Sequence, residues 1–319
     1  MAARYSESEL IEKLFAPIAG PAGLGLSDDA ALVDTTEKTV ATLDALVAGV
    51  HFFADDPPAA IAKKALRVNL SDLAAKGAEP LGFLLGLALP RDWTNDWLAA
   101  FAEGLAEDAA LFRCPLVGGD TVATPGPLTI SVTALGRAPG GRFVPRSGAK
   151  AGDGVYVSGT IGDAALGLAL RRAPLLAARL SPPSRDFLLE RYLLPRPRLS
   201  LAPVLLATAS AAMDVSDGLA GDLAKLARAS KVSARIALAD APLSPAAHEA
   251  LALEPRLFET AMTGGDDYEI LCCGGDALEK SAGAALTKIG EILAGDTSPE
   301  FFDANGISFN FNCLSFEHF

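Results

Sequence analysis

The chain has 319 residues, a formal net charge of -12, 50% hydrophobic residues and a mean hydropathy of +0.30. This length allows two domains with cores of ordinary size, and the composition is that of a globular chain. The sequence holds no basic tract that could displace the counterions of a phosphate backbone, so the negative balance argues against a nucleic-acid partner.

The N-terminal residues, MAARYSESELIEKLF, lack the basic start and apolar core of a secretory signal. No apolar run reaches the roughly 20 residues that a membrane-spanning helix needs. With three histidines and no H-E-x-x-H, a zinc hydrolase is disfavoured. Buried reduced thiols are expected, rather than a disulfide or a zinc site, for Cys114, Cys272, Cys273 and Cys313. These features predict a soluble cytoplasmic protein.

Helical and strand patterns alternate through the first 136 residues, which predicts a mixed α/β domain. The expected elements are a helix over 6–16, strands over 30–33 and 40–47, a helix over 58–78, a strand over 81–90, a helix from about 94 with both tryptophans on its first turn, and strands in PLVGGDT and LTISVTALG.

The segment RAPGGRFVPRSGAKAGD concentrates Gly, Pro and basic residues, which is typical of a linker. A second α/β domain follows, so the predicted domains are 1–137 and 138–319. Its expected elements are a strand in VYVSG, a helix over 163–172, a helical pair around RYLLPRPRLS, a strand in AAMDVS, a helix in GLAGDLAKLARAS and a strand in SARIALA.

Aspartates punctuate apolar, strand-like runs from one end of the chain to the other. They are Asp28 and Asp29 in GLSDDAALV, Asp44 in TVATLDALV, Asp72 in VNLSDLAAKGAEP, Asp120 in PLVGGDT, Asp214 and Asp217 in AAMDVSDGLAGD, and Asp266 and Asp267 in TGGDDYEIL. Unpaired buried charges are costly, so these carboxylates call for cations. An all-oxygen ligand set favours several Mg²⁺ ions, and clustered Mg²⁺ in turn indicates phosphate chemistry.

Several of the candidate site residues also have a simpler structural interpretation. Asn69, Asp72 and Lys76 share one helical face, which could be an exposed polar stripe with an Asp72–Lys76 ion pair. Asp44 could be a turn residue at the end of a strand, and His51 an ordinary loop histidine. Ser216 or Asp217 could be a helix N-cap, and Arg146 a surface residue instead of a phosphate ligand.

Known phosphate-binding motifs are absent from the sequence. There is no G-x-x-x-x-G-K-[ST], and the nearest dinucleotide fingerprint, GLGLSD, ends in Asp28 where a third glycine belongs and precedes a strand. In GGDT and TGGDDYE, glycines would let backbone N–H groups approach an anion while the adjacent carboxylates hold a cation. This combination suits a metal-bound polyphosphate.

Taken in order, GLSDDAALV, LDALVAGVHF, KALRVNLSDLAAKGAEP, PLVGGDT, VPRSGAKAGDGVYVSGTIGDAALGL, MDVSDGLAGDL, GGDDYEIL, IGEI and FEHF resemble the thiamine-monophosphate kinase family. The resemblance begins near residue 24 and reaches the C-terminus. It implies the two-domain fold of the superfamily that also contains aminoimidazole ribonucleotide synthetase and selenophosphate synthetase. It also implies a homodimer formed through the N-terminal domains.

The implied activity is ATP-dependent transfer of a phosphoryl group onto the phosphate of thiamine monophosphate, the final step of thiamine diphosphate synthesis. The resemblance implies a role for each of a set of residues. They are Asp28, Asp29, Thr42, Leu43, Asp44, Asp72, Asp120, Asp214 and Asp217 for Mg²⁺, Gly119, Arg146 and Ser216 for ATP, and His51, Asp266 and Phe316 for the thiamine substrate. The acceptor is an ionised phosphate, so we expect direct in-line transfer with no general base and no catalytic side chain.

The chain departs from the family pattern at several positions. Ser27 replaces a frequent glycine, Leu43 a threonine, and TVATPGP the usual T-T-R-G segment, whose arginine is missing. Asp266 replaces a glutamate, and Phe316 a tryptophan or tyrosine. Leu43 retains its backbone carbonyl as a metal ligand.

Phe316 is expected to stack on the thiamine rings, while Phe309 and Phe311 are expected in the core.

Two rival functions share the metal cluster: a superfamily enzyme with another acceptor, and a non-catalytic sensor of Mg-nucleotide. Selenophosphate synthesis would favour a reactive cysteine near the N-terminus, and the first cysteine is Cys114.

Overall fold

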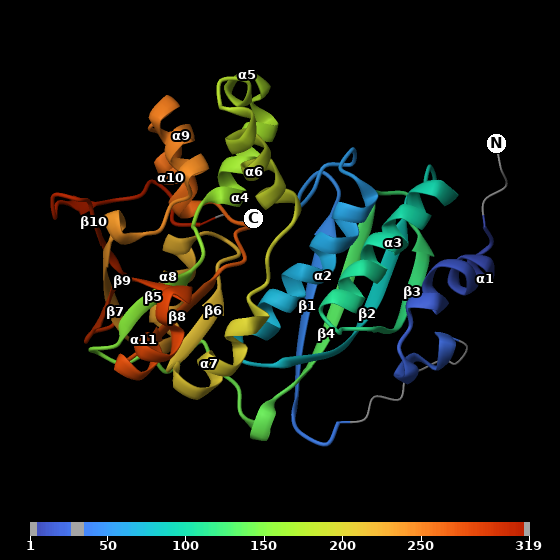
Figure 1. Cartoon of the computed structure of the whole chain (residues 1–319), viewed down its shortest axis with the longest axis horizontal. Helices are drawn as coiled ribbons and strands as arrows, with labels where there is room; N and C mark the ends of the chain where they lie inside the picture. Colours follow the sequence, from blue (N-terminus) through green and yellow to red (C-terminus); the bar gives the residue numbers. More distant parts are fainter. Residues whose placement is uncertain (1–4, 27–34, 316–319) are drawn as a thin grey trace. The chain divides into compact units, whose positions relative to one another are not determined.

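The computed structural model describes residues 5–26 and 35–315. The chain divides into two compact units. Unit 1 contains Ala78–Arg142 and the described residues up to Leu73, and unit 2 contains Ala74–Gly77 and the residues from Phe143 onward. Each unit is built around one mixed sheet with helices on it (Figure 1), so the expected mixed α/β fold class is confirmed.

The elements of unit 1 are α1 (Glu7–Leu10), β1 (Thr39–Val47), α2 (Pro58–Ala75), β2 (Glu79–Leu89), α3 (Asn95–Leu111), β3 (Leu116–Ala123) and β4 (Thr129–Arg137). A π-helical turn, Ile11–Phe15, follows α1, so the expected N-terminal helix is present in a broken form. The sheet order is β1-β4-β2-β3, with β2 and β3 parallel and both pairings of β4 antiparallel. The predicted strand over 30–33 lies outside the described residues.

One face of this sheet is covered by α2 and α3 (Figure 1). Strand β4 alternates, and its buried residues Ile130, Val132 and Ala134 are fully shielded from solvent. A Cβ on Gly104 would lie 2.6 Å from the Ala59 backbone, so α3 and α2 approach each other closely there. The helices and this face of the sheet form the core of the unit.

Helix α3 begins at a conventional cap. The Thr94 hydroxyl accepts a hydrogen bond from the Trp97 backbone nitrogen at 3.1 Å. Trp97 lies on the first turn and stacks on Phe101, with 5.4 Å between ring centroids. Trp93 precedes the cap, so the expectation that both tryptophans lie on the helix is wrong for Trp93.

The other face of the sheet, here called the open face, carries exposed apolar side chains in the part of the chain that the structure describes. Leu43, Leu84 and Val122 on this face are 59%, 37% and 50% exposed. The register places Leu43 and Leu84 in one row, both beside Thr133 of β4. A row of apolar side chains in solvent is unusual for a strand face and is available for a partner.

The elements of unit 2 are β5 (Gly154–Ser158), α4 (Asp163–Arg172), α5 (Pro174–Ala177), α6 (Pro182–Leu193), α7 (Ala202–Thr208), β6 (Ala211–Asp214), α8 (Leu219–Ser230), β7 (Ser233–Ala237), α9 (Pro245–Leu253), α10 (Leu257–Thr263), β8 (Ile270–Gly274), α11 (Asp276–Ala282), β9 (Leu286–Leu293), β10 (Glu300–Phe302) and β11 (Ser308–Phe309). The sheet order is β11-β10-β7-β9-β5-β8-β6.

Both faces of this second sheet are buried. Along β5, Val155 and Val157 enter the larger core with α4, α6 and α8, whereas Tyr156 enters the smaller core with α7 and α11. The neighbouring Cys272 and Cys273 of β8 are divided between the two cores in the same way. Strands buried on both sides explain the continuous apolar runs in the sequence.

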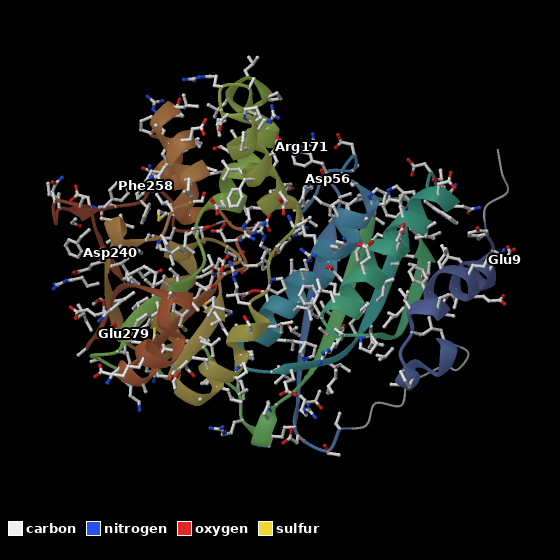
Figure 2. All side chains as sticks on the ribbon, viewed as in Figure 1. Glu9, Asp56, Arg171, Asp240, Phe258 and Glu279 are labelled. Carbon is white, nitrogen blue, oxygen red and sulfur yellow. The ribbon has the colours of Figure 1, made fainter. Side chains whose placement is uncertain are left out.

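The C-terminal aromatic residues pack against the larger core, as expected for Phe309 and Phe311. Phe309 meets Phe311 and Phe258 edge-on at 5.0 and 5.9 Å between ring centroids; Phe258 belongs to α10 (Figure 2). Phe311 meets Phe301 of β10 at 5.1 Å. These contacts fix the terminal segment up to this point.

All four cysteines are free, and Cys114, Cys272 and Cys273 are buried. Cys313 is exposed, so the expectation of a buried thiol is wrong at that position. Burial raises the pKa of Cys114 to about 12 and the pKa of Cys272 well above its ordinary value. Among the described residues, no helix is long and apolar enough to cross a membrane.

Candidate functional site

In unit 1, two of the predicted metal-binding residues of β1, Thr42 and Asp44, face α2, whereas Leu43 lies on the opposite face. The Thr42 hydroxyl donates to an Asp72 carboxylate oxygen, and the Asp44 backbone nitrogen donates to Asn69 Oδ1 at 3.1 Å. Asn69 is fully buried, and its Nδ2 donates to the Ala65 carbonyl oxygen at 3.0 Å. The interpretation as an exposed polar stripe is therefore wrong, because this face of α2 is turned toward the strand.

Asp120 and Gly119 lie on β3, at the opposite edge of the sheet from Asp44. The register runs from Asp44 through Val132 and Leu85 to Gly119, so these four residues point to one face. Asp120 is the next residue and points to the open face. Three strand spacings separate Asp44 from β3, about 14 Å. Unit 1 therefore does not bring these two carboxylates together.

Close strand contact explains one of the glycines in the GGD motif. A Cβ on Gly119 would lie 2.1 Å from the Leu85 carbonyl oxygen, a distance that no side chain tolerates. The backbone at Asp120 is thereby held tightly against β2.

His51 lies in the loop between β1 and α2, and its ring has a defined orientation. Its Nδ1 accepts a hydrogen bond from the Val47 backbone nitrogen at 3.0 Å, which leaves Nε2 to carry the proton in the neutral ring. The buried Lys64 ammonium donates to the His51 carbonyl oxygen at 3.0 Å. The loop is thus fixed by both its backbone and its side chain.

The same loop forms one wall of a cavity of about 910 Å³ within unit 1. The other walls come from the segments that follow β2 and β3. Both tryptophans of the chain, Trp93 and Trp97, line it together with Arg91 and Asp92. The volume and the aromatic lining are typical of a small-molecule site, which the sequence analysis did not predict.

In unit 2, the predicted residues Asp214, Ser216 and Asp217 follow one another at the end of β6. Asp214 is 6% exposed. The N-cap of α8 is Gly218, with φ of 111°, so the interpretation of Ser216 or Asp217 as the cap is wrong. The position instead requires a glycine, because its Cβ would meet the Thr263 backbone at 2.5 Å.

Asp222, which the sequence analysis did not select, organises this turn. One of its oxygens accepts from the backbone nitrogens of Ser216 and Asp217 at 3.0 and 2.9 Å, and the other accepts from Lys225 Nζ at 2.8 Å. Lys225 also contacts the Asp217 carboxylate. Burial raises the pKa of Asp222, and the Lys225 ammonium opposes that rise.

Arg146 is exposed on a segment beside β6. The Ala212 nitrogen donates to the Pro145 carbonyl oxygen at 3.0 Å, which aligns this segment with the strand that leads to Asp214. The Ser230 hydroxyl contacts the Arg146 carbonyl oxygen at 3.4 Å. Unit 2 thus holds Arg146, Asp214 and Ser216 on neighbouring backbone segments.

Asp266 lies in the segment Gly264–Tyr268, here called the GGDDY loop. Its φ is +74°, and its backbone nitrogen donates to the Ser216 carbonyl oxygen at 2.8 Å. A Cβ on Gly265 would lie 2.2 Å from that same oxygen. The structure therefore brings together a predicted substrate contact, Asp266, and a predicted ATP contact, Ser216.

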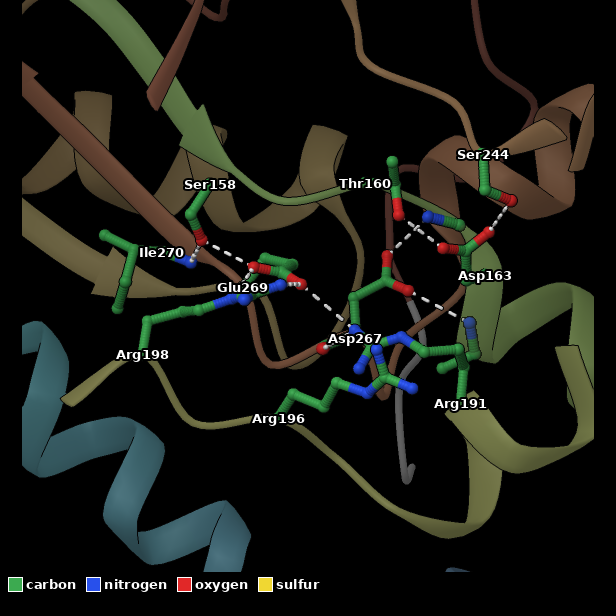
Figure 3. Close-up of polar contacts among 12 residues, drawn as sticks. Ser158, Thr160, Asp163, Arg191, Arg196, Arg198, Ser244, Asp267, Glu269 and Ile270 are labelled. Atoms are coloured by element: carbon green, nitrogen blue, oxygen red, sulfur yellow. Dashed lines mark hydrogen bonds and ion pairs between the residues drawn. The ribbon is translucent and has the colours of Figure 1, made fainter. Parts of the chain in front are cut away.

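A buried polar network lies behind the GGDDY loop (Figure 3). Asp267 and Glu269 are completely buried, and Arg191 is 2% exposed. Burial raises the pKa of Asp267 well above its usual range, against the opposing effect of amide donors. One signal in the sequence pointed to this network, the charges inside the apolar segment TGGDDYEIL, but the arginines that pair with them are far away in sequence.

Three predicted site residues, Asp28, Asp29 and Phe316, lie outside the described residues. In the ranges 5–26 and 35–315, no group of three or more His, Cys, Asp or Glu side chains is arranged to hold a metal ion. The predicted ligands that are described are carboxylates, a hydroxyl and a carbonyl, all oxygen donors.

Comparison with known proteins identifies the family. The model of the AIR synthase related protein N-terminal domain matches residues 27–138, and that of the C-terminal domain matches residues 150–298. Thiamine-monophosphate kinase of Caulobacter vibrioides is 42% identical, covering 96% of this chain and 87% of that protein. The Escherichia coli (strain K12) enzyme is 40% identical, with 93% and 92% covered. The chain belongs to the thiamine-monophosphate kinase family.

Solved structures of family members agree with this assignment. Thiamine-monophosphate kinase from Stenotrophomonas maltophilia K279a is 39% identical with a TM-score of 0.79, covering 89% of this chain and 91% of that one. AaThiL complexed with AMPPCP and TMP is 31% identical with a TM-score of 0.80, covering 98% and 94%. The hydrogenase maturation protein HypE, at 19% identity and a TM-score of 0.79, shares the fold. The expected resemblance and two-domain fold type are confirmed.

Proposed function

We propose that the chain catalyses phosphoryl transfer from ATP to thiamine monophosphate, which yields thiamine diphosphate and ADP. The observation that carries this proposal is family membership along nearly the whole chain, including likeness to AaThiL complexed with an ATP analogue and TMP. The bond that breaks joins the γ-phosphorus to its bridging oxygen, and the new bond joins that phosphorus to an oxygen of the substrate phosphate. The acceptor is already ionised, so no base must remove a proton.

We further propose that several Mg²⁺ ions bind between the substrates and the aspartates. The ligands would be Asp28, Asp29, Thr42, Leu43 through its carbonyl, Asp44, Asp72, Asp120, Asp214 and Asp217. Oxygen donors fit a hard divalent cation, and five of these residues are in partly or fully buried positions, namely Thr42, Asp44, Asp72, Asp214 and Asp217. When bound, the ions would neutralise the two polyanions and the charge on the transferring group.

The remaining polar groups would position the substrates. Gly119, Arg146 and Ser216 are proposed to contact ATP, and His51, Asp266 and Phe316 the thiamine substrate. The loop that bears His51 forms a wall of the tryptophan-lined cavity, so we propose that the thiamine rings enter this cavity. Indole faces attract a cationic ring such as the thiazolium.

The enzyme is proposed to act as a cytoplasmic homodimer through unit 1. Leu43, Leu84 and Val122 give the open sheet face an apolar character. Asp120 points to this face, whereas Asp44 points to the other. A second copy would give each chain a way to combine such residues in one site. In this scheme residues 1–137 bind ATP and Mg²⁺ and form the dimer, and residues 138–319 complete the nucleotide and substrate site.

An ATPase assay with product identification tests the proposal. Purified protein with MgATP is expected to form thiamine diphosphate and ADP only when thiamine monophosphate is present, and free thiamine should not be phosphorylated. Hydrolysis of ATP that does not respond to thiamine monophosphate would indicate another acceptor. Nucleotide binding without turnover would indicate a sensor.

A further inference from the structure

The GGDDY loop has a backbone conformation that needs external support. Asp266 and Tyr268 have φ of +74° and +50°, although neither is a glycine. The left-handed region is unfavourable for a residue with a side chain, so an isolated loop would relax to other conformations. Hydrogen bonds to the β6–α8 turn hold one side of it, from the Asp266 and Tyr268 nitrogens to the Ser216 and Val215 carbonyl oxygens, both at 2.8 Å.

The other side of the loop is held by two buried charged residues. The Asp267 carboxylate accepts from the Gly162 and Ala164 backbone nitrogens, at 2.6 and 3.1 Å, at the start of α4. Nη2 of Arg191, on α6, donates to the Asp267 carbonyl oxygen at 3.3 Å and to Glu269 Oε1 at 3.0 Å (Figure 3). One guanidinium thus links the loop to Glu269, the residue directly before β8.

Glu269 does not depend on Arg191 for its charge compensation. Arg198 Nε donates to Glu269 Oε2 at 2.6 Å, and the Ser158 hydroxyl donates to the same oxygen at 2.6 Å. The contact to Glu269 also raises the pKa of Arg198. Removal of Arg191 therefore leaves Glu269 paired with Arg198 and Ser158, whereas the Asp267 carbonyl oxygen loses its contact with the guanidinium.

One nitrogen of the Arg191 guanidinium lacks a hydrogen-bond partner. Its Nη1 is the one buried side-chain nitrogen or oxygen among the described residues without a hydrogen-bond partner. A buried guanidinium with an unpartnered nitrogen lowers the stability of the fold, so stability alone does not explain an arginine at this position. Its retained contact to the Asp267 carbonyl points to a role in the geometry of the loop.

We propose that Arg191 and Asp267 are positioning residues that hold the GGDDY loop so that Asp266 meets the substrate. This inference rests on the proposed function for the role of Asp266. Arg191 fixes the carbonyl that follows Asp266, and Asp267 fixes the loop to α4. Neither residue touches the reacting atoms in this scheme.

The test compares Arg191→Met with Arg185→Met, the same change at a partly exposed position of the same helix. Arg191→Met is expected to raise the KM for thiamine monophosphate about tenfold, as the loss of one charged hydrogen bond predicts, with little change in the KM for ATP. Arg185→Met should change neither. A purely structural role would lower kcat through the fraction of folded enzyme and leave both KM values unchanged, which would overturn the proposal.

A double-mutant cycle with Asp266→Ala adds a second criterion. If Arg191 acts through Asp266, Arg191→Met should have little further effect on the KM for thiamine monophosphate in the Asp266→Ala background. Additive effects would contradict the proposal. Arg191→Lys keeps the charge and one donor, so it should restore part of the substrate KM, and it serves as the test variant if Arg191→Met does not fold.

Amide hydrogen exchange separates this inference from the proposed function. Peptides that cover 264–268 should exchange faster in Arg191→Met than in the wild type, while peptides of β9 are unchanged. This readout needs no substrate. Faster exchange without thiamine monophosphate kinase activity in the wild type would sink only the function, and unchanged exchange in an active enzyme would sink only the positioning role.

Discussion

The four-stranded sheet of unit 1 carries helices on one face, whereas the seven-stranded sheet of unit 2 packs against helices on both. The predicted site residues are supported differently as a result. In unit 1, Thr42 and Asp72 are held by contacts between a strand and one helix. In unit 2, Asp217 and Asp266 lie on turns fixed by buried charges such as Asp222 and Asp267. Strand-borne residues thus need little polar support, while turn-borne residues need a network behind them.

The largest expected effect comes from Asp72→Asn in unit 1. The change preserves shape and the contact with Thr42 but removes a proposed metal ligand. Turnover should fall roughly 10²- to 10³-fold, as when a charge-stabilising group is lost from an active site, with little change in melting temperature. Steady-state kinetics and thermal denaturation measure both. Asp296→Asn, in an exposed loop of unit 2, is the control, and near wild-type turnover in Asp72→Asn would falsify the metal role.

The next effect concerns the open face of unit 1. Leu43→Arg places a charge in the apolar row and is expected to convert a dimer to a monomer and to remove most of the activity, while the monomer stays folded. Light scattering coupled to gel filtration measures the mass. Leu175→Arg on α5, where the leucine is 88% exposed, should leave mass and activity unchanged. A wild-type protein that is fully active as a monomer would contradict the proposed dimer through this face.

A smaller effect is expected from the tryptophan-lined cavity. Because Trp93 and Trp97 are the two tryptophans of the chain and both line it, intrinsic fluorescence reports on its occupancy. Thiamine monophosphate should quench the emission to saturation, and Trp97→Phe should reduce the amplitude. N-acetyltryptophanamide titrated in parallel corrects for collisional quenching. Quenching by ATP alone would assign the cavity to the nucleotide instead.

The smallest effect concerns the thiols. Their alkylation rates compare how well the interiors of the two units are protected from solvent. Alkylation of native protein at pH 8 should modify Cys313 alone and leave activity unchanged, because Cys313 is exposed. Cys114 in unit 1 and Cys273 in unit 2 should resist, since burial raises their pKa values and leaves little thiolate. Mass spectrometry of the digested protein gives the positions. Rapid labelling of Cys114 without denaturant would show that the core of unit 1 opens readily.

Much of the fold could be predicted from local pattern. The apolar run TVATLDALV, the prolines before α2 and the threonine cap of α3 indicate elements close to those observed. The network behind the GGDDY loop could not be predicted, because Arg191 is 76 residues from Asp267 and 78 from Glu269. The opposite directions of Asp44 and Asp120 depend on strand order, which local pattern does not contain. Asp222 lies within the motif AAMDVSDGLAGD. Its contact with the Ser216 backbone nitrogen depends on the turn at Gly218, whose positive φ local pattern does not reveal.

The adjacent pair Cys272–Cys273 has a consequence for the study of folding. Each thiol enters a different core of unit 2, so a single short peptide carries one reporter for each layer of the domain. Pulsed alkylation in mild denaturant would show whether the two layers melt together or in sequence. Equal labelling rates would describe one cooperative folding unit, and unequal rates would describe two that share a sheet.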